Sequence, residues 1–330
     1  MMDSARIFEV LRITLPVFGV IGIGNFLSRR NIMNEDHQRF LNDLAYYLSL
    51  PALIFVELAS QPFYKLLDSV LIFSTLISIS IIFILYSAGA LIFRLKGGLA
   101  AAVIFGTYWA NVTYMGFPLA SSAFGIEQGL AKAAIINAFS IPVFVAVSFI
   151  MIGFTSERGQ RNIVASVRNA LLNPVILAAL TGLAVAWIIS ALKLNSSSGS
   201  VPLPLKEAAM SAKAFLRLVG TMGLPLALLA VGGKLRIKAI GRHFVPLSFT
   251  VLGKLILLPL ITIAVFKLLF PAADKMVAGV AVLLMATPVA VATSVVSSKF
   301  KVEEQFVSSL LAVSTILSII TIPLWLYFIL

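Results

Sequence analysis

Long stretches of this 330-residue chain contain no charged residue. A helix of about 20 apolar residues crosses the hydrocarbon core of a bilayer. Six uncharged runs reach that length, and they are Val70–Phe93, Gly97–Ile126, Ala133–Ser156, Asn169–Leu192, Met276–Ser298 and Gln305–Leu330. Four further runs are shorter or carry one internal charge, namely Ile13–Ser28, Leu44–Ser60, Leu218–Gly233 and Phe244–Phe270. The sequence therefore predicts an all-α integral membrane protein with ten transmembrane helices.

Composition argues against several other classes of protein. Only 12% of the residues are charged, whereas a soluble domain keeps about a quarter of its residues charged. The chain has no cysteine, and His37 and His243 both lie beside charged loops, so we predict no disulfide, metal site or cofactor. No carboxylate dyad or HExxH motif suggests an enzyme. The net charge of +12 comes from short basic clusters between apolar runs, a pattern typical of membrane loops rather than of nucleic-acid binding.

The basic residues also predict an orientation. Loops after the first, third, fifth, seventh and ninth runs hold more Lys and Arg than the loops on the opposite side, and such residues collect on the cytoplasmic side. The densest of these loops is Gly233–His243. We therefore predict a multi-pass protein of the cell (inner) membrane with both termini on the non-cytoplasmic side. The long connection Lys193–Arg217 would hold a flexible linker at Asn195–Ser200 and an amphipathic part lying along the interface.

The prolines indicate an internal repeat. They occupy the first, second, fourth and fifth spans of each half, as Pro16, Pro51, Pro118 and Pro142 and then as Pro174, Pro225, Pro288 and Pro323. A repeat with five spans forces its second copy to be inverted in the bilayer, which is an arrangement typical of secondary transporters. We predict a first five-helix repeat at residues 1–156, an inter-repeat loop with helix 6 at 157–204, and the rest of the second repeat at 205–330.

Pro118 and Pro288 differ from the other prolines because each lies in mid-span among small or polar residues. Those neighbours are Asn111 before the first proline and Thr287, Thr293 and Ser294 around the second. A helix interrupted there exposes polar backbone at mid-membrane, and the N-termini of the half-helices favour an anion. Matching interruptions in two inverted copies indicate the binding site of a transporter. The alternative is a pair of simple kinks.

Further residues within the spans each have two interpretations. Lys254, about ten residues into its span, either attracts an anion or carries a proton, or its long stem reaches the interface or pairs with a carbonyl. Tyr108, Trp109 and Tyr114 either line a pocket or pack against other helices. Glu57 is expected at the membrane interface rather than in a proton-carrying role.

The string Asn111-x-x-x-Met115-Gly116-Phe117-Pro118-Leu119, followed by Phe124-Gly125, resembles the fourth-helix motif of the auxin efflux carrier family. That family includes plant PIN-type carriers and bacterial permeases for malate or malonate. Leu50-Pro51, Asn173-Pro174, Ala286-Thr287-Pro288 and Ile322-Pro323 extend the resemblance over nearly the whole chain. It implies the fold of the bile-acid/sodium symporters, in which the broken helices 4 and 9 cross. It also implies a dimeric scaffold of helices 1, 2, 6 and 7, and a transport domain of helices 3–5 and 8–10.

The resemblance places the substrate at the crossing of helices 4 and 9, where Asn111 would hydrogen-bond a carboxylate. The implied substrate-binding residues are Asn111, Met115, Gly116, Pro118, Thr287, Pro288 and Lys254, and the residues that could line the pocket are Tyr108, Tyr114, Thr293 and Ser294. The chain departs from the plant carriers in two ways: it lacks their long hydrophilic loop, and it has Val289 where they usually have glutamine. Both departures favour a bacterial organic-anion carrier over an auxin carrier.

The sequence and the resemblance together predict secondary active or potential-driven transport of a small carboxylate anion by elevator-type alternating access. The partners would be the anion, the lipid bilayer and a second copy of the chain. A sodium-coupled symporter of the bile-acid type is the alternative. The hydroxyls near Pro288 and the amide of Asn111 could supply some sodium ligands, but no membrane-buried carboxylate joins them, so we assign no metal site. A passive channel would instead need a continuous polar stripe along several helices.

Overall fold

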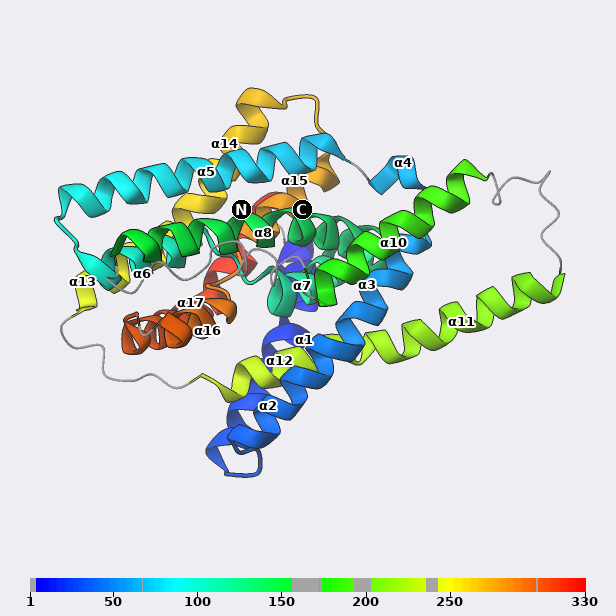
Figure 1. Ribbon diagram of the computed structural model, residues 1–330, viewed down its shortest axis with the longest axis horizontal. Coiled ribbons are helices and arrows are strands. Elements are labelled where there is room, and N and C mark those ends of the chain that lie inside the picture. Colours follow the sequence, from blue (N-terminus) through cyan, green and yellow to red (C-terminus); the bar gives the residue numbers. More distant parts are fainter. Residues whose placement is uncertain are drawn as a thin grey trace.

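The computed structural model describes residues 4–66, 68–155, 172, 174–192, 203–235, 243–300 and 302–330. These residues form helices joined by short connections, with one isolated bridge between Ala110 and Val289 (Figure 1). Asn173, the predicted linker Asn195–Ser200 and most of the predicted loop Gly233–His243 lie outside the described residues.

The helices follow one another along the chain in a fixed order, in which η marks a π-helical segment. Up to residue 155 they are α1 (Ser4–Arg29), α2 (Glu35–Leu44), η1 (Ala45–Ser49), α3 (Leu50–Ala59), α4 (Phe63–Leu66), α5 (Ser69–Ile92), α6 (Gly97–Tyr108), η2 (Val112–Gly116), α7 (Phe117–Phe124), η3 (Gly125–Leu130) and α8 (Ala131–Thr155). After residue 172 they are α10 (Pro174–Ala191), α11 (Leu203–Thr221), α12 (Gly223–Gly233), α13 (Phe244–Leu252), η5 (Gly253–Leu257), α14 (Leu258–Leu269), α15 (Lys275–Met285), α16 (Ala292–Phe300) and α17 (Glu304–Ile329).

Seven helical stretches in the described part of the chain are long and apolar enough to cross a membrane. They are Ala5–Arg29, Glu35–Ala59, Ser69–Ile92, Pro174–Ala191, Leu203–Gly233, Phe244–Leu269 and Glu304–Ile329. The prediction of an all-helical, multi-pass membrane protein is therefore confirmed. The difference from ten has a structural reason, because Gly97–Ile126 and Met276–Ser298 are each divided into shorter helices. The remaining predicted span corresponds to α8, and the count of ten crossings stays a prediction.

Three of these stretches begin well before their apolar runs, and the first of them starts at Ala5 rather than at Ile13. The second stretch starts with α2, a polar helix whose first turn is capped by the side chain of Asn34, which accepts a hydrogen bond from the backbone of His37. The fifth starts with the amphipathic α11, which is the described part of the predicted interfacial segment. The helices begin before the apolar runs because charged and polar side chains on an exposed helix face do not interrupt a helix.

A buried ion pair joins α3 to α11. The Arg217 guanidinium donates to both carboxylate oxygens of Glu57 at 2.7 and 2.9 Å, and Glu57 has no exposed surface. A bidentate arginine from a neighbouring helix allows this carboxylate to be buried, and the expectation that Glu57 lies at the depth of the membrane interface stays a prediction. Arg217 also donates to Glu127 of η3 at 3.2 Å.

Three π-helical segments share a cause. η1, η2 and η5 each lead directly into an α-helix with proline at its second residue, namely Pro51, Pro118 and Pro259. Proline removes a backbone donor and its ring crowds the carbonyl four residues earlier. A wider turn before the proline accommodates both effects without ending the helix.

The helices divide into two packing groups. In the first group, α1 and α2 pack against α12, and α3 lies beside α10 and α11. In the second, α5 packs against α6 and α14, and α15 packs against α14 and α17. Figure 1 shows the first group toward the bottom and right of the view and the second toward the top and left.

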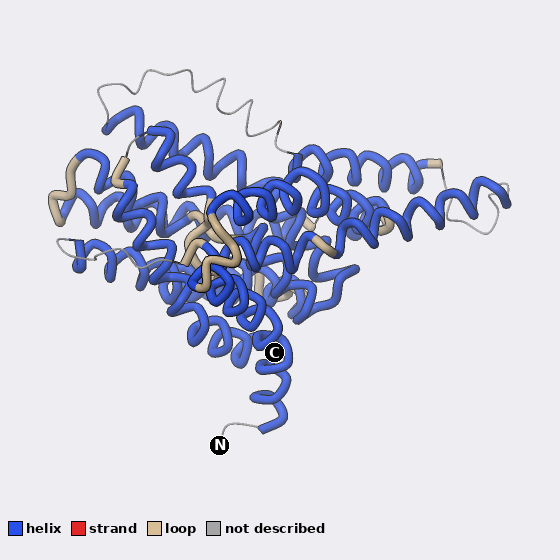
Figure 2. Tube along the Cα trace, turned by 90° about the horizontal axis from the view of Figure 1, so that it is seen from below, coloured by secondary structure: helices blue, strands red, loops and turns tan. Residues whose placement is uncertain are grey.

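The start of α1 lies beside the end of α17. The Arg6 guanidinium lies 5.9 Å from the centre of the Tyr327 ring, and Figure 2 shows the two chain ends on the same side of the molecule. Both ends of the chain therefore belong to one end of the helix assembly.

Candidate functional site

Two interrupted helices meet at the centre of the candidate site. α6 ends at Tyr108 before η2 begins, and α15 ends at Met285 before α16 begins. The two linkers pair as a short antiparallel bridge, in which the Asn111 N–H donates to the Pro288 carbonyl at 3.0 Å and the Ala290 N–H donates to the Trp109 carbonyl at 3.1 Å. This pairing satisfies backbone groups that would otherwise be unpaired in a buried, apolar setting.

Only one of the two breaks lies at its predicted proline. The second break contains Pro288, but the first covers Trp109 to Asn111, well before Pro118. Pro118 is buried at the second residue of α7, which continues directly from η2. The prediction that the helix opens at Pro118 is therefore wrong, because the wide turns of η2 accommodate that proline without a break.

Asn111 occupies the start of η2 with an unused donor. Its side-chain oxygen accepts from the Tyr114 N–H at 3.3 Å, and because a backbone N–H can only donate, this contact fixes the orientation of the amide. The amide nitrogen is then left without a partner, although the residue is only 2% exposed. A buried donor without an acceptor costs about 1–3 kcal/mol, so this nitrogen favours an acceptor from a ligand or a water molecule.

Lys254 contacts the helix end that precedes the second break. It is fully buried on η5, and its ammonium group donates to the Met285 carbonyl at 2.7 Å. Met285 is the last residue of α15, so the cation sits at the negative end of that half-helix. No carboxylate among the described residues forms an ion pair with Lys254. Lys254 therefore does pair with a carbonyl, which was one of the interpretations drawn from the sequence, and its role in attracting an anion stays a prediction.

The predicted hydroxyl residues around Pro288 use their protons locally. Thr287 donates to Leu284, Thr293 to Ala290 and Ser294 to Val291, each at 2.7 Å. These bonds close the end of α15 and the start of α16, so these three side chains shape the helix ends. Their oxygens keep capacity to accept.

Met115 and Gly116 set the packing of η2. Met115 is fully buried in a cluster with Leu119, Leu228 and Leu283. A Cβ at Gly116 would lie 2.6 Å from the Leu284 side chain, so glycine lets η2 lie close to α15. Both residues hold the first break in place rather than offering polar groups.

The two predicted tyrosines have different surroundings. Tyr108 is 1% exposed, its hydroxyl lies 2.8 Å from the Ser148 hydroxyl, and its ring contacts Phe83 and Phe144. Its polar end is therefore used inside the helix packing. Tyr114 is partly buried and packs against a small apolar cluster. That cluster consists of Val231, Val291 and Leu311.

A polar cavity of about 370 Å³ lies next to this cluster. One face of α2 lines it with Glu35, Gln38, Arg39 and Asn42, and the other lining residues are Gly233, Lys234, Ser294, Ser308 and Leu311. Ser294, one of the predicted pocket-lining residues, therefore lines this cavity, and Leu311 belongs both to its wall and to the apolar cluster. The cavity lies between the two packing groups.

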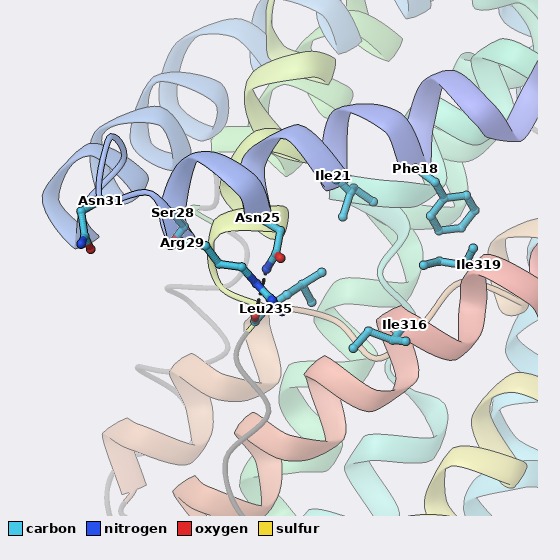
Figure 3. Close-up of a pocket in the computed structure, with 10 residues that line it drawn as sticks. Phe18, Ile21, Asn25, Ser28, Arg29, Asn31, Leu235, Ile316 and Ile319 are labelled. Atoms are coloured by element: carbon cyan, nitrogen blue, oxygen red, sulfur yellow. Dashed lines mark hydrogen bonds between the residues drawn. The ribbon is translucent and has the colours of Figure 1, made fainter.

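A second cavity, of about 660 Å³, lies between α1 and α17 (Figure 3). Its walls include Phe18, Ile21, Ile316 and Ile319, and no predicted site residue lines it. The amide nitrogen of Asn25 is committed there to the Gly232 and Leu235 carbonyls. We therefore do not take this cavity as the candidate site.

Asn137 is a buried polar residue that the sequence analysis missed. It lies on α8, is 2% exposed, and its side-chain oxygen accepts from the Thr113 hydroxyl at 3.2 Å. Its amide nitrogen has no partner. A single asparagine in an apolar run forms no motif, although an amide inside a predicted membrane span could have been noted as costly.

Comparison with known proteins identifies the family. A family model described as "Membrane transport protein" matches residues 10–326. The chain belongs to this family. It is the family of the auxin efflux carriers, so the resemblance seen in the sequence is confirmed. The description of this family is membrane transport, which agrees with the prediction from the sequence.

Two relatives illustrate the similarity within this family. The chain is 30% identical over 126 residues to an uncharacterized transporter of Methanocaldococcus jannaschii, which is 37% of this chain and 40% of the relative. It is 28% identical over 203 residues to the "Putative malonate transporter" of Rhizobium meliloti, which is 60% of each chain. The chain thus matches about half the length of these two relatives.

Proposed function

We propose that this protein carries a small carboxylate anion across the cell (inner) membrane and binds it where the two broken helices meet. The observation that carries this proposal is the free, buried amide nitrogen of Asn111 at that junction. A carboxylate offers only acceptors, and hydrogen bonds to a charged acceptor are stronger than neutral ones. The malonate in the name of the Rhizobium relative suggests a first compound to test.

The electrostatics of the junction support an anion. Lys254 is a fully buried lysine whose only described partner is the Met285 carbonyl. A buried charge without a counter-charge is costly, and an anion nearby lowers that cost. The start of η2 contributes the positive end of a helix dipole on the side of Asn111.

The mechanism we propose is an elevator movement between the two packing groups. α1, α2, α3, α10, α11 and α12 would form the scaffold, which corresponds to predicted helices 1, 2, 6 and 7, and the scaffold would dimerise. The other helices would form the transport domain, with the ten spans arranged as two inverted repeats. The polar cavity beside α2 lies between the groups and would give access to the junction. Adjacent chain ends agree with an even number of crossings, and both ends would face the non-cytoplasmic side.

The test is uptake by proteoliposomes that contain the purified protein. Labelled malate, malonate and indole-3-acetate would be offered with and without sodium, and current would be recorded. We expect saturable, sodium-independent uptake of a small carboxylate by the wild type. Asn111→Ala should lower it by about tenfold or more, because a hydrogen bond to a charged group contributes about 1.5–3 kcal/mol.

Asn25→Ala is the matched control for this test. It also removes a mostly buried amide, but the Asn25 nitrogen is already bonded to two carbonyls away from the junction. Its uptake should resemble that of the wild type once the amount of folded protein is matched. Sodium-dependent uptake would favour the symporter alternative, and absence of uptake for all three compounds would contradict the proposed substrate class.

A further inference from the structure

We propose that Asn137 is a second substrate-binding amide, and that it binds the second carboxylate of a compact dicarboxylate whose first carboxylate is bound by Asn111. This inference rests on the proposed function and adds a residue and a substrate class to it. The evidence for it is the set of buried hydrogen-bond donors near the two breaks that have no acceptor.

Asn111 and Asn137 stand apart from the other polar residues of the core. Among the described residues, the buried side-chain nitrogens without a hydrogen-bond partner are those of Asn111 and Asn137. The other unpartnered buried side-chain atoms are hydroxyl oxygens. By contrast, the buried amide nitrogen of Gln38 donates to the Ser28 hydroxyl and the Met33 carbonyl.

Asn137 and Asn111 both attach to the first turn of η2. Asn111 caps the open end of that turn, and Thr113, two residues further on, donates its hydroxyl proton to the Asn137 oxygen at 3.2 Å. This bond occupies the acceptor end of the Asn137 amide and leaves its donor end available. The two free N–H₂ groups therefore come from different helices, and the oxygen of each amide accepts a hydrogen bond from a residue of η2.

The backbone at the junction leaves few donors for a ligand. The N–H groups of Asn111, Val289 and Ala290 donate to Pro288, Ser314 and Trp109, respectively. The Val112 N–H donates to the Ala110 carbonyl. These four backbone donors are therefore not available to a ligand, and the two asparagine amides are the buried side-chain N–H₂ groups that have no partner among the described residues.

Two separate amide donors suit a ligand with an acceptor group at each end. A short dicarboxylate has this form, whereas a monocarboxylate of the same length would engage only one amide. Asn137 would therefore act on selectivity between these two classes, and Asn111 would act on both. Loss of the Asn137 donor should weaken the dicarboxylate alone.

The experiment measures the KM of malonate uptake into proteoliposomes and the inhibition constant of propionate against that uptake. Asn137→Ala is the main variant, because it adds no charge, whereas Asn137→Asp keeps an oxygen that accepts from Thr113 but adds a negative charge that repels any carboxylate. Asn137→Ala removes both ends of the amide. Thermal unfolding of each purified variant checks that the full chain is folded.

We expect both variants to raise the KM of malonate by about tenfold or more, as loss of one charge-assisted hydrogen bond implies, and Asn137→Ala to leave the inhibition constant of propionate unchanged. An unchanged KM of malonate in Asn137→Ala would overturn the inference and would mean that this amide holds only a water molecule. An equal weakening of both compounds would also overturn it, since a general structural role would act in that way. If the wild type takes up no carboxylate, the proposed function itself fails, which is a distinct result.

Discussion

The two broken helices have the same backbone plan but are completed by different side chains. In the first broken helix, Asn111 precedes η2, the segment after the break, and its side-chain N–H₂ group is free. In the second, Lys254 and Thr287 satisfy carbonyls at the end of the first segment. A repeated backbone therefore offers a ligand donor at one break and a buried positive charge at the other. Under the proposed function, the first break recognises the anion and the second balances its charge.

The largest effect is expected from Lys254→Met, which removes the charge at the second break while keeping a long apolar side chain. Uptake of the carboxylate should fall by about two orders of magnitude or more, because losing a buried charge interaction costs about 3–5 kcal/mol. The protein should still purify as a folded species. The measurement is initial uptake by proteoliposomes at matched protein content.

Lys267→Met provides the control for that variant, because Lys267 is an exposed lysine on the neighbouring α14. It should transport like the wild type. Normal uptake by Lys254→Met would mean that Lys254 only stabilises the end of α15 through the Met285 carbonyl. It would contradict the proposal that the second break balances the charge of the anion.

A smaller effect is expected from Ser314→Ala, which tests how firmly the second break is held. The Ser314 hydroxyl accepts from the Val289 N–H at 3.3 Å, and both residues are fully buried. Leaving that N–H unsatisfied should lower the free energy of unfolding by about 1–3 kcal/mol, which thermal unfolding would detect.

Ser318→Ala on the same helix is the comparison for this variant, because Ser318 is equally buried and donates only to the Thr315 carbonyl of its own helix. It should change stability less than Ser314→Ala. Equal losses of stability in the two variants would show that the hydrogen bond between Ser314 of α17 and the second break adds no more to the free energy of unfolding than a bond within α17.

The smallest effect is expected at the far end of the first broken helix, where Glu127 accepts from Arg217. Glu127→Gln should change the free energy of unfolding by less than about 1 kcal/mol, because the Glu127 carboxylate is 65% exposed. If this contact holds one position of the transport domain, the uptake rate should change and should lose part of its salt dependence.

Glu57→Gln gives the opposite extreme at the same arginine. It removes the charge of a buried carboxylate that Arg217 holds with two hydrogen bonds, and it should cost about 1.5–3 kcal/mol, because the arginine left behind is partly exposed and keeps Glu127 as a partner. A loss of stability in Glu127→Gln as large as that of Glu57→Gln would contradict the distinction between a buried and an exposed pair.

Several features were predictable because they depend on local sequence. Uncharged runs of membrane-spanning length predicted a multi-pass helical protein, and the motif around Asn111 and Pro118 identified the family. The polar residues beside Pro288 marked the second break correctly. Each of these signals depends on residues close together in the chain, so none of them needed knowledge of the neighbouring helices.

Other features depend on contacts between distant residues, and only the tertiary structure decided them. The first break lies at Trp109 to Asn111 because its linker pairs with the linker at Pro288, and a proline alone cannot reveal that partner. The free donor of Asn137 becomes visible only once α8 lies against η2. Lys254 shows the same division. The sequence by itself determined that this lysine is embedded in an apolar span. Only the tertiary structure decided that its side chain donates to the carbonyl at the end of α15, because burial and hydrogen-bond partners are properties of the assembled helices.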